Sequence, residues 1–250
     1  MKKIYILPNL FTTANMFCGY FAVISSLQGN FVTAAWAIML SIVFDSMDGR
    51  VARMTSAVSA FGIEYDSLSD LISFGLAPAL MAYKWALEPF GRMGWLATFL
   101  YLACAALRLA RFNVSATVAA KSYFQGLPSP VAAASIATSI LFYHELSLEL
   151  PKQNYMLAMV LLLGSLMVSM IRFVSLKDLK VNRENAFGIL AVVTLVFVLL
   201  AIRPEITLFV MCVGYIAFGF VSNLVRLIRE RTQPASTSTT TSMSGTSNQH

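Results

Sequence analysis

Long apolar segments, separated by short polar ones, run through most of the chain. A helix that crosses a bilayer needs about 20 mostly apolar residues, and the sequence contains eight segments of that kind. They are Pro8–Leu27, Phe31–Gly49, Ser67–Trp85, Trp95–Arg111, Pro130–Leu148, Tyr155–Val174, Ala186–Ile202 and Ile206–Leu227. The pattern predicts an all-α polytopic membrane protein with about eight transmembrane helices.

The composition agrees with that architecture and argues against a soluble domain. Hydrophobic residues make up 58% of the chain, charged residues make up 12%, and the mean hydropathy is +0.71. A soluble globular domain is markedly less apolar and more highly charged. After Arg231 a Ser/Thr-rich stretch begins, which cannot bury apolar surface. We therefore expect a membrane-embedded domain over residues 1–231 and a disordered tail over residues 232–250.

Lysine and arginine are distributed unevenly over the predicted loops, which indicates the orientation of the chain. With eight spans and a cytoplasmic N-terminus, 14 of the 18 basic residues fall on the cytoplasmic side, where positive charge is normally in excess. The other four are Lys84, Arg92, Lys152 and Arg203. We expect an integral protein of the cell membrane with both termini in the cytoplasm. The net charge of +6 is spread over many helix ends, so nucleic acid is not an expected partner.

Four of the five aspartates of the chain lie close together in the sequence, at the end of the second predicted span and the start of the third. They are Asp45, Asp48, Asp66 and Asp70. Spacings of three and four residues place each pair on one face of its helix. A carboxylate at bilayer depth costs about 2.5–3.5 kcal/mol on insertion scales, so such residues are candidates for a functional site.

Four converging carboxylates would repel one another and raise one another's pKa values unless cations lie among them. Ligation by oxygen alone favours Mg²⁺ or Mn²⁺, and proteins often hold these ions together with substrate phosphates. We expect two divalent ions that bridge a diphosphate, with one carboxylate available as a base. Two other interpretations of the aspartates stay open. One is ion pairing with arginines at the membrane interface, and the other is the ion pathway of a cation-coupled transporter.

The stretch DSMDGRVARMTSAVSAFGIEYDSLSD reads as D-x2-D-G-x2-A-R-x8-G-x3-D-x3-D. This pattern resembles the signature of the CDP-alcohol phosphatidyltransferase family. The resemblance implies a membrane enzyme with a six-helix core plus, here, two C-terminal helices, usually found as a homodimer, that transfers a phosphatidyl group from CDP-diacylglycerol to an alcohol. It also implies that Asp45, Asp48 and Asp66 ligate metal, and that Asp70 is the general base and can also touch metal.

The same resemblance assigns residues to the nucleotide. Those matching Gly49 and Ala52 line the cytidine pocket, and the arginine matching Arg53 supports the phosphate or the loop. In the first span, polar residues on one helical face can either reach the nucleotide or form interhelical hydrogen bonds. The residues expected at the nucleotide are Thr12, Asn15, Asp45, Gly49, Ala52, Arg53 and Gly62.

Three further segments, LPNLFTTANMFCG, RLARFN and QGLPSP, are similar to the phosphatidylserine synthase branch of that family. This similarity implies L-serine as the acceptor, with phosphatidylserine and CMP as products. Arginine can bind a carboxylate or a phosphate with two hydrogen bonds, although the same arginines could simply extend to the membrane surface. The residues expected at the acceptor or the lipid phosphate are Arg108, Arg111, Asn113 and Ser129. Choline, glycerol phosphate or inositol as the acceptor, and an archaeal-type lipid donor, remain as alternatives.

Overall fold

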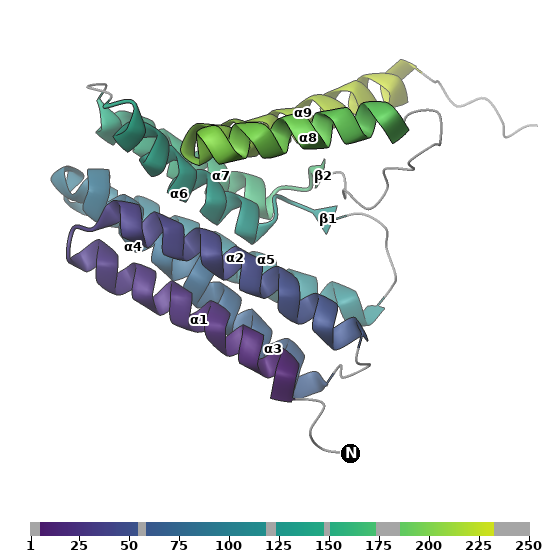
Figure 1. Ribbon diagram of the computed structural model, residues 1–250, viewed down its shortest axis with the longest axis horizontal. Coiled ribbons are helices and arrows are strands. Elements are labelled where there is room, and N and C mark those ends of the chain that lie inside the picture. The colour runs from purple at the N-terminus through teal and green to yellow at the C-terminus, as the bar shows by residue number, and fades with distance from the viewer. Residues whose placement is uncertain (1–5, 55–58, 119–123, 148–150, 174–185, 233–250) are drawn as a thin grey trace, which may run out of the picture.

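The computed structural model describes residues 6–54, 59–118, 124–147, 151–173 and 186–232, and within these ranges the chain is almost entirely helical (Figure 1). The α-helices are α1 (Ile6–Leu27), α2 (Phe31–Met54), α3 (Ala60–Asp70), α4 (Ala77–Ala82), α5 (Arg92–Val118), α6 (Ser129–Glu145), α7 (Lys152–Val168), α8 (Ala186–Ile202) and α9 (Pro204–Thr232). Shorter elements are the π-helical segments η1 (Leu71–Leu76) and η2 (Tyr83–Leu87), the 3-10 turn η3 (Glu88–Phe90), and the antiparallel two-residue strands β1 (Phe124–Gln125) and β2 (Arg172–Phe173).

The helices coincide with the eight predicted apolar segments, and the all-α membrane architecture is confirmed. Four of them contain stretches that are long and apolar enough to cross a membrane: Pro8–Leu27, Phe31–Val51, Arg92–Val114 and Pro204–Asn223. Two shorter apolar helical stretches are Lys152–Val168 and Leu190–Ile202. The protein is an integral membrane protein, and eight as the number of spans remains a prediction. Of the predicted tail, all but Thr232 lies outside the described residues.

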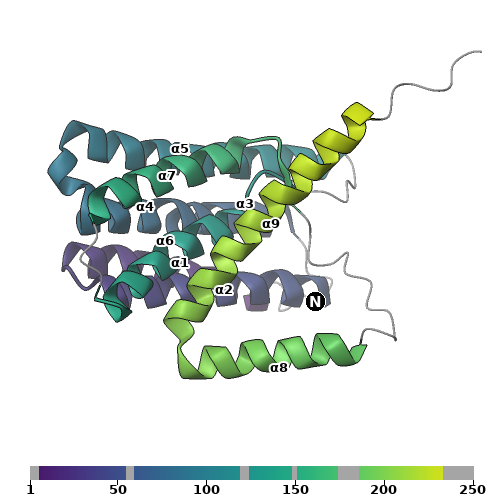
Figure 2. The ribbon, with the colours of Figure 1, turned by 90° about the horizontal axis from the view of Figure 1, so that it is seen from above.

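Helices α1 to α7 run side by side as a bundle, α9 crosses α6 obliquely, and α8 is joined to α9 at one end and diverges from it (Figures 1 and 2). Because the chain reverses direction between successive spans, the bundle has two ends. One holds the C-terminal turns of α2 and the start of α3, and we call it the aspartate end. The other holds the turn between α1 and α2, η3, and the connection from α6 to α7, and we call it the distal end.

Small side chains dominate the contacts between the helices, as is usual where helices pack in a membrane. The buried core contains many alanines, among them Ala22, Ala34 and Ala77. The closest approach is between α1 and η1. A Cβ atom added at Gly19 would lie 2.4 Å from Oγ and 2.7 Å from Cα of Ser73, so this crossing requires glycine. It holds α1 against the segment that directly follows Asp70.

The predicted third span is one continuous helical path, but it changes type along its length. Pro78 in α4 has no backbone N–H, so the carbonyl of Phe74, four residues earlier, cannot receive its usual helical hydrogen bond. The hydroxyl of the buried Tyr101 on α5 donates to that carbonyl at 3.1 Å. The π-helical segments η1 and η2 lie on either side of α4. Such π turns are frequent at functional sites, and η1 begins directly after Asp70.

The two C-terminal helices differ in how they attach to the bundle. On α9, Phe209 stacks on Phe142 of α6 with ring centroids 4.5 Å apart. Arg203, just before α9, forms an ion pair with Glu145 at the end of α6. Helix α8 instead exposes apolar side chains such as Leu190 and Phe197. Helix α9 therefore packs against the bundle, whereas the apolar surface of α8 suits contact with lipid.

Candidate active site

The four aspartates of the motif converge at the aspartate end of the bundle, as their spacing predicts. Asp45 and Asp48 lie on the last turns of α2, and Asp66 and Asp70 lie on α3. One carboxylate oxygen from each of Asp45, Asp48 and Asp66 lies within 4.8 Å of the others. The Asp70 carboxylate is within hydrogen-bonding reach of Asp45. Two helices therefore contribute one acidic cluster.

Helix α1 orients two of these carboxylates through polar side chains. The Thr12 hydroxyl lies 3.2 Å from Oδ2 of Asp48 and 3.2 Å from the carbonyl oxygen of Pro8, one turn earlier. The Asn15 side-chain amide donates to Oδ1 of Asp70 at 3.1 Å. Both Thr12 and Asn15 are buried. The interhelical hydrogen bonds considered for the first span are therefore present, and contact of the two residues with a nucleotide stays a prediction.

Two serines on the opposite side of this contact bond to the backbone of α1. The Ser69 hydroxyl donates to the carbonyl of Thr12 at 3.0 Å, and the Ser73 hydroxyl donates to the carbonyl of Asn15 at 2.9 Å. Each serine thus holds the backbone of the residue whose side chain contacts an aspartate. Neither serine was among the residues predicted for the site. Their spacing of four residues from each other, beside the two aspartates, is the signal that could have identified them.

The acidic cluster has the character expected of a site for divalent cations. Oδ1 of Asp66 is buried and has no hydrogen-bond partner. Burial, followed by the negative charge of Asp45, raises the pKa of the Asp66 carboxyl to about 6. A bound cation would supply the missing partner and offset the repulsion, because an opposite charge favours the ionised carboxylate. The oxygens of Asp45, Asp48 and Asp66 fit a hard divalent ion. Among the described residues, Asp70 lies beside this set of three, next to Asp45.

A second polar group lies next to the aspartates, where α5 meets the start of α6. Nη1 of Arg108 donates to Oγ of Ser129 at 2.9 Å, and the two residues come from segments predicted to bind the acceptor. The Nε atom of Arg108 is buried and has no hydrogen-bond partner. The guanidinium interacts electrostatically with Asp70 and with Tyr215 of α9. Tyr215 lies on α9, beyond the segments that carry the motifs, and was therefore not predicted at the site.

Backbone hydrogen bonds hold the segment before Ser129 against the end of α7 and the residues that follow it. The N–H of Gly126 donates to the carbonyl of Ile171 at 2.9 Å, and the N–H of Leu127 donates to the carbonyl of Leu166 at 3.0 Å. Gly126 has φ of +85°, and an added Cβ would lie 2.2 Å from the carbonyl oxygen of Met167. Only glycine fits at this turn. The end of α7 therefore sets the position at which α6, and with it Ser129, begins.

Three further predicted residues, Asn113, Arg111 and Gly62, lie on α5 and at the start of α3. Asn113 exchanges hydrogen bonds with Ser67 of α3, with its Nδ2 2.9 Å from the serine Oγ, so it joins α5 to the aspartate helix. Arg111 lies one turn beyond Arg108 on α5. The N–H of Gly62 donates to the N-cap hydroxyl of Ser59 at 3.0 Å.

Three residues expected at the nucleotide lie near the end of α2. Gly49 is partly buried on its last turns. The side chains of Ala52 and Arg53 lie outside what the structure describes. Contact of these three residues with a nucleotide stays a prediction.

Residues 5–156 match the CDP-alcohol phosphatidyltransferase family. The chain is 38% identical, over 232 residues, to a CDP-diacylglycerol–serine O-phosphatidyltransferase of Helicobacter pylori (strain ATCC 700392 / 26695), covering 92% of this chain and 95% of the relative. It is 34% identical, over 167 residues, to the enzyme of that name from Bacillus subtilis (strain 168), covering 67% and 89%. An archaetidylserine synthase of Methanothermobacter thermautotrophicus is 43% identical over 145 residues, covering 56% and 61%. The chain belongs to the CDP-alcohol phosphatidyltransferase family.

Proposed function

We propose that this enzyme transfers the phosphatidyl group of CDP-diacylglycerol to the hydroxyl of L-serine, giving phosphatidylserine and CMP in phospholipid biosynthesis. The observation that carries the choice of acceptor is the partly buried Arg108 guanidinium, which interacts with Asp70 and has a buried Nε atom without a hydrogen-bond partner. Serine brings a carboxylate to pair with the guanidinium and a hydroxyl to meet the base. Two serine O-phosphatidyltransferases that this chain matches over most of their lengths support the same acceptor.

The metal cofactor of this proposal is a divalent ion, Mn²⁺ or Mg²⁺, and two ions are expected. Asp45, Asp48 and Asp66 would hold them, with Asp70 at the edge of the set. The buried and unpartnered Oδ1 of Asp66 supports this assignment. When bound, the ions would supply positive charge to the diphosphate of the donor and to the departing CMP.

Asp70 is the proposed general base. It removes the proton from the serine hydroxyl, and the serine oxygen attacks the β-phosphorus of CDP-diacylglycerol, the one that bears the diacylglycerol oxygen. A new P–O bond to serine forms as the P–O bond to CMP breaks. Asn15 holds the Asp70 carboxylate in position through its amide, and Arg108 with Ser129 holds the serine carboxylate. Positioning and charge stabilisation account for most of the rate.

The cytidine nucleotide is placed against α1 and the last turns of α2. Oδ1 of Asn15 is buried and has no hydrogen-bond partner, so it can accept from a ligand hydroxyl. We assign Thr12, Gly49 and Gly62 to the same site. Ala52, Arg53 and Asp45 complete the nucleotide set, and Arg111 and Asn113 complete the acceptor and lipid-phosphate set.

The position of the aspartate end also suggests where the lipid donor lies and on which side of the membrane the reaction takes place. The acyl chains of the donor remain in the bilayer while its diphosphate reaches the aspartate end. We place this end, both termini and most basic loops in the cytoplasm, with the protein in the cell membrane as a homodimer. An archaeal-type donor with the same acceptor is the second candidate, which the archaetidylserine synthase relative favours.

The test is CMP release by the detergent-purified enzyme with Mn²⁺ or Mg²⁺. Serine, choline, glycerol 3-phosphate and inositol are compared as acceptors, first with CDP-diacylglycerol and then with the archaeal ether-lipid donor. Serine-dependent release that a chelator abolishes is expected. Asp45→Asn and Asp70→Asn should abolish it while the protein stays folded, and near-normal turnover in both variants would refute the metal and base assignments. Release with a different acceptor would keep the chemistry and overturn the assignment of Arg108.

A further inference from the structure

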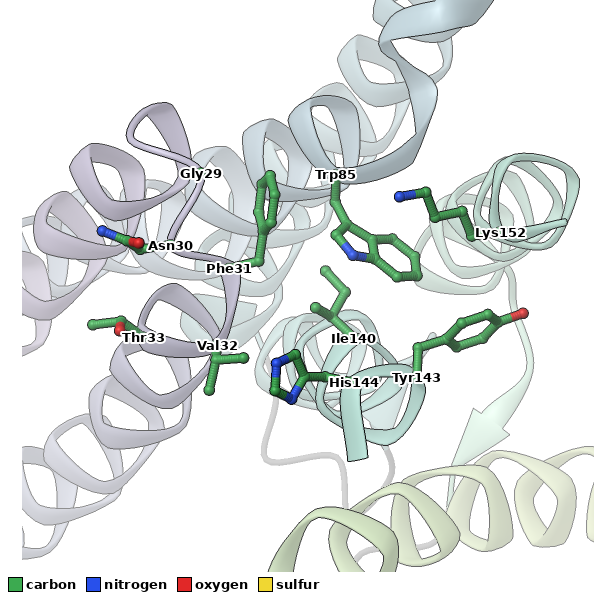
Figure 3. A pocket seen from close by; sticks show the side chains of 10 residues that line it. All are labelled: Gly29, Asn30, Phe31, Val32, Thr33, Trp85, Ile140, Tyr143, His144 and Lys152. Carbon is green, nitrogen blue, oxygen red and sulfur yellow. The ribbon is translucent and has the colours of Figure 1, made fainter. Parts of the chain in front are cut away.

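A cavity of about 410 Å³ opens at the distal end, the end of the bundle opposite the aspartates (Figure 3). Four parts of the chain form it: the turn before α2, η2, the end of α6 and the start of α7. The proposed reaction uses none of them. Two of the helices at the cavity also reach the candidate active site. Helix α2 carries Asp45 and Asp48 on its last turns, and α6 begins at Ser129.

The walls of the cavity are largely aromatic and aliphatic. Trp85 and Tyr143 meet edge to face, with ring centroids 5.3 Å apart and planes at 82°. Tyr143 in turn packs on Tyr155 with centroids 5.4 Å apart. Phe31 and Ile140 complete the apolar lining, and Figure 3 shows Phe31, Trp85 and Ile140 around the same space. Tryptophan and tyrosine of this kind typically lie at the depth of lipid headgroups.

The charge of the lining is positive. The Lys152 ammonium lies 5.4 Å from the centroid of the Trp85 ring, which positions it at the cavity. The lining also includes His144, and none of the ten lining residues is acidic. Lys84, which is close by in η2, forms an ion pair with Glu88. For Lys152 the described contact is the indole ring of Trp85, and none of the described ion pairs includes it.

We propose that this cavity binds the phosphate of an anionic phospholipid headgroup. The ammonium of Lys152 supplies the charge, the imidazole of His144 supplies a hydrogen-bonding group, and the aromatic walls suit the glycerol region of the lipid. A quaternary ammonium headgroup does not fit, because the cation of Lys152 already occupies the face of Trp85. The site is separate from the proposed reaction, since Phe31 and Asp45 lie roughly 20 Å apart along α2.

Trp85 makes the site directly measurable. A variant that retains only this tryptophan is obtained with Trp36→Phe and Trp95→Phe, and it is reconstituted in phosphatidylcholine nanodiscs. Phosphatidylglycerol brominated near the glycerol backbone is then titrated against equally brominated phosphatidylcholine, and quenching of Trp85 fluorescence is followed. One favourable charge near a membrane surface predicts about a fivefold preference for the anionic lipid.

Lys152→Gln in this background should abolish the preference. Arg92→Gln, which removes an exposed cation near the same end outside the cavity, should leave it unchanged. Equal quenching by the two lipids, or a preference that persists in Lys152→Gln, would overturn the proposal. Suppression of the preference by inorganic phosphate would identify a site for a soluble anion and would also overturn it. If Lys152→Gln does not fold, retention of phosphatidylglycerol over phosphatidylcholine by the unmodified protein in native mass spectrometry decides the matter.

Discussion

The side-chain amide of Asn15 donates to Oδ1 of Asp70 at 3.1 Å, while the backbone carbonyl of Asn15 accepts from the Ser73 hydroxyl at 2.9 Å. The residue is therefore fixed at both its side chain and its backbone, and it presents one face to the proposed base. A hydrogen bond to a charged group contributes about 1.5–3 kcal/mol. This relationship makes Asn15 a residue that positions Asp70, in addition to any contact with the nucleotide.

Asn15→Ala should lower kcat for CMP release by roughly tenfold to a hundredfold, because the Asp70 carboxylate loses its donor. The measurement is steady-state CMP release over a range of serine concentrations. Asn154→Ala, which makes the same change at an exposed position near the start of α7, is the matched control and should keep near-normal turnover. Unchanged kcat in Asn15→Ala would show that Asp70 does not depend on this hydrogen bond.

Thr12→Val should weaken activation by Mn²⁺ roughly tenfold to a hundredfold, because the hydroxyl that bonds to Asp48 is lost while the volume is kept. The measurement is CMP release as a function of free Mn²⁺, with binding checked by electron paramagnetic resonance. A hydroxyl that serves only packing would leave the Mn²⁺ dependence unchanged. Thr33→Val at the distal end is a suitable control, because Thr33 is exposed and far from the aspartates in the bundle.

Gly19→Ala should destabilise the protein by about 1–3 kcal/mol and reduce activity, because the new methyl group collides with Ser73. The closest main-chain contact would be 2.7 Å from Cα of Ser73, so the additional change Ser73→Ala should not restore stability. Thermal unfolding in detergent measures the effect. Gly214→Ala on α9 is the control, since nothing lies within 4 Å of the added Cβ. Equal stability of the two alanine variants would contradict the close crossing of α1 and η1.

The aspartate cluster could be predicted from sequence because helical spacing alone places Asp45 with Asp48 and Asp66 with Asp70, and the structure confirms that the pairs meet. The partners of the cluster could not be predicted in the same way. Thr12 could be placed on a face of the first helix, but its contact with Asp48 depends on how closely α1 crosses its neighbours. That crossing depends on the absence of a side chain at Gly19, which hydropathy does not reveal.

The third span shows a second kind of limit. Its apolar length predicts a helix, and the structure has a helical path there, but the changes to π geometry on either side of Pro78 follow from three-dimensional contacts. A proline in an apolar helix leaves one carbonyl without its donor. Sequence alone does not show which side chain replaces that donor. Tyr101 is more than twenty residues away in the chain and reaches the carbonyl only because α5 packs against this segment.

Tyr101→Phe should destabilise the protein by about 1–2 kcal/mol, because the carbonyl of the buried Phe74 then loses the hydrogen bond from the Tyr101 hydroxyl. The expected result is a lower midpoint of thermal unfolding in detergent. Tyr20→Phe, which removes a hydroxyl from an exposed tyrosine on α1, is the matched control and should leave the midpoint unchanged. The double variant Tyr101→Phe with Pro78→Ala restores an N–H at position 78 and should recover part of the lost stability. No loss in Tyr101→Phe, or no recovery in the double variant, would show that this tyrosine does not satisfy the carbonyl that proline leaves free.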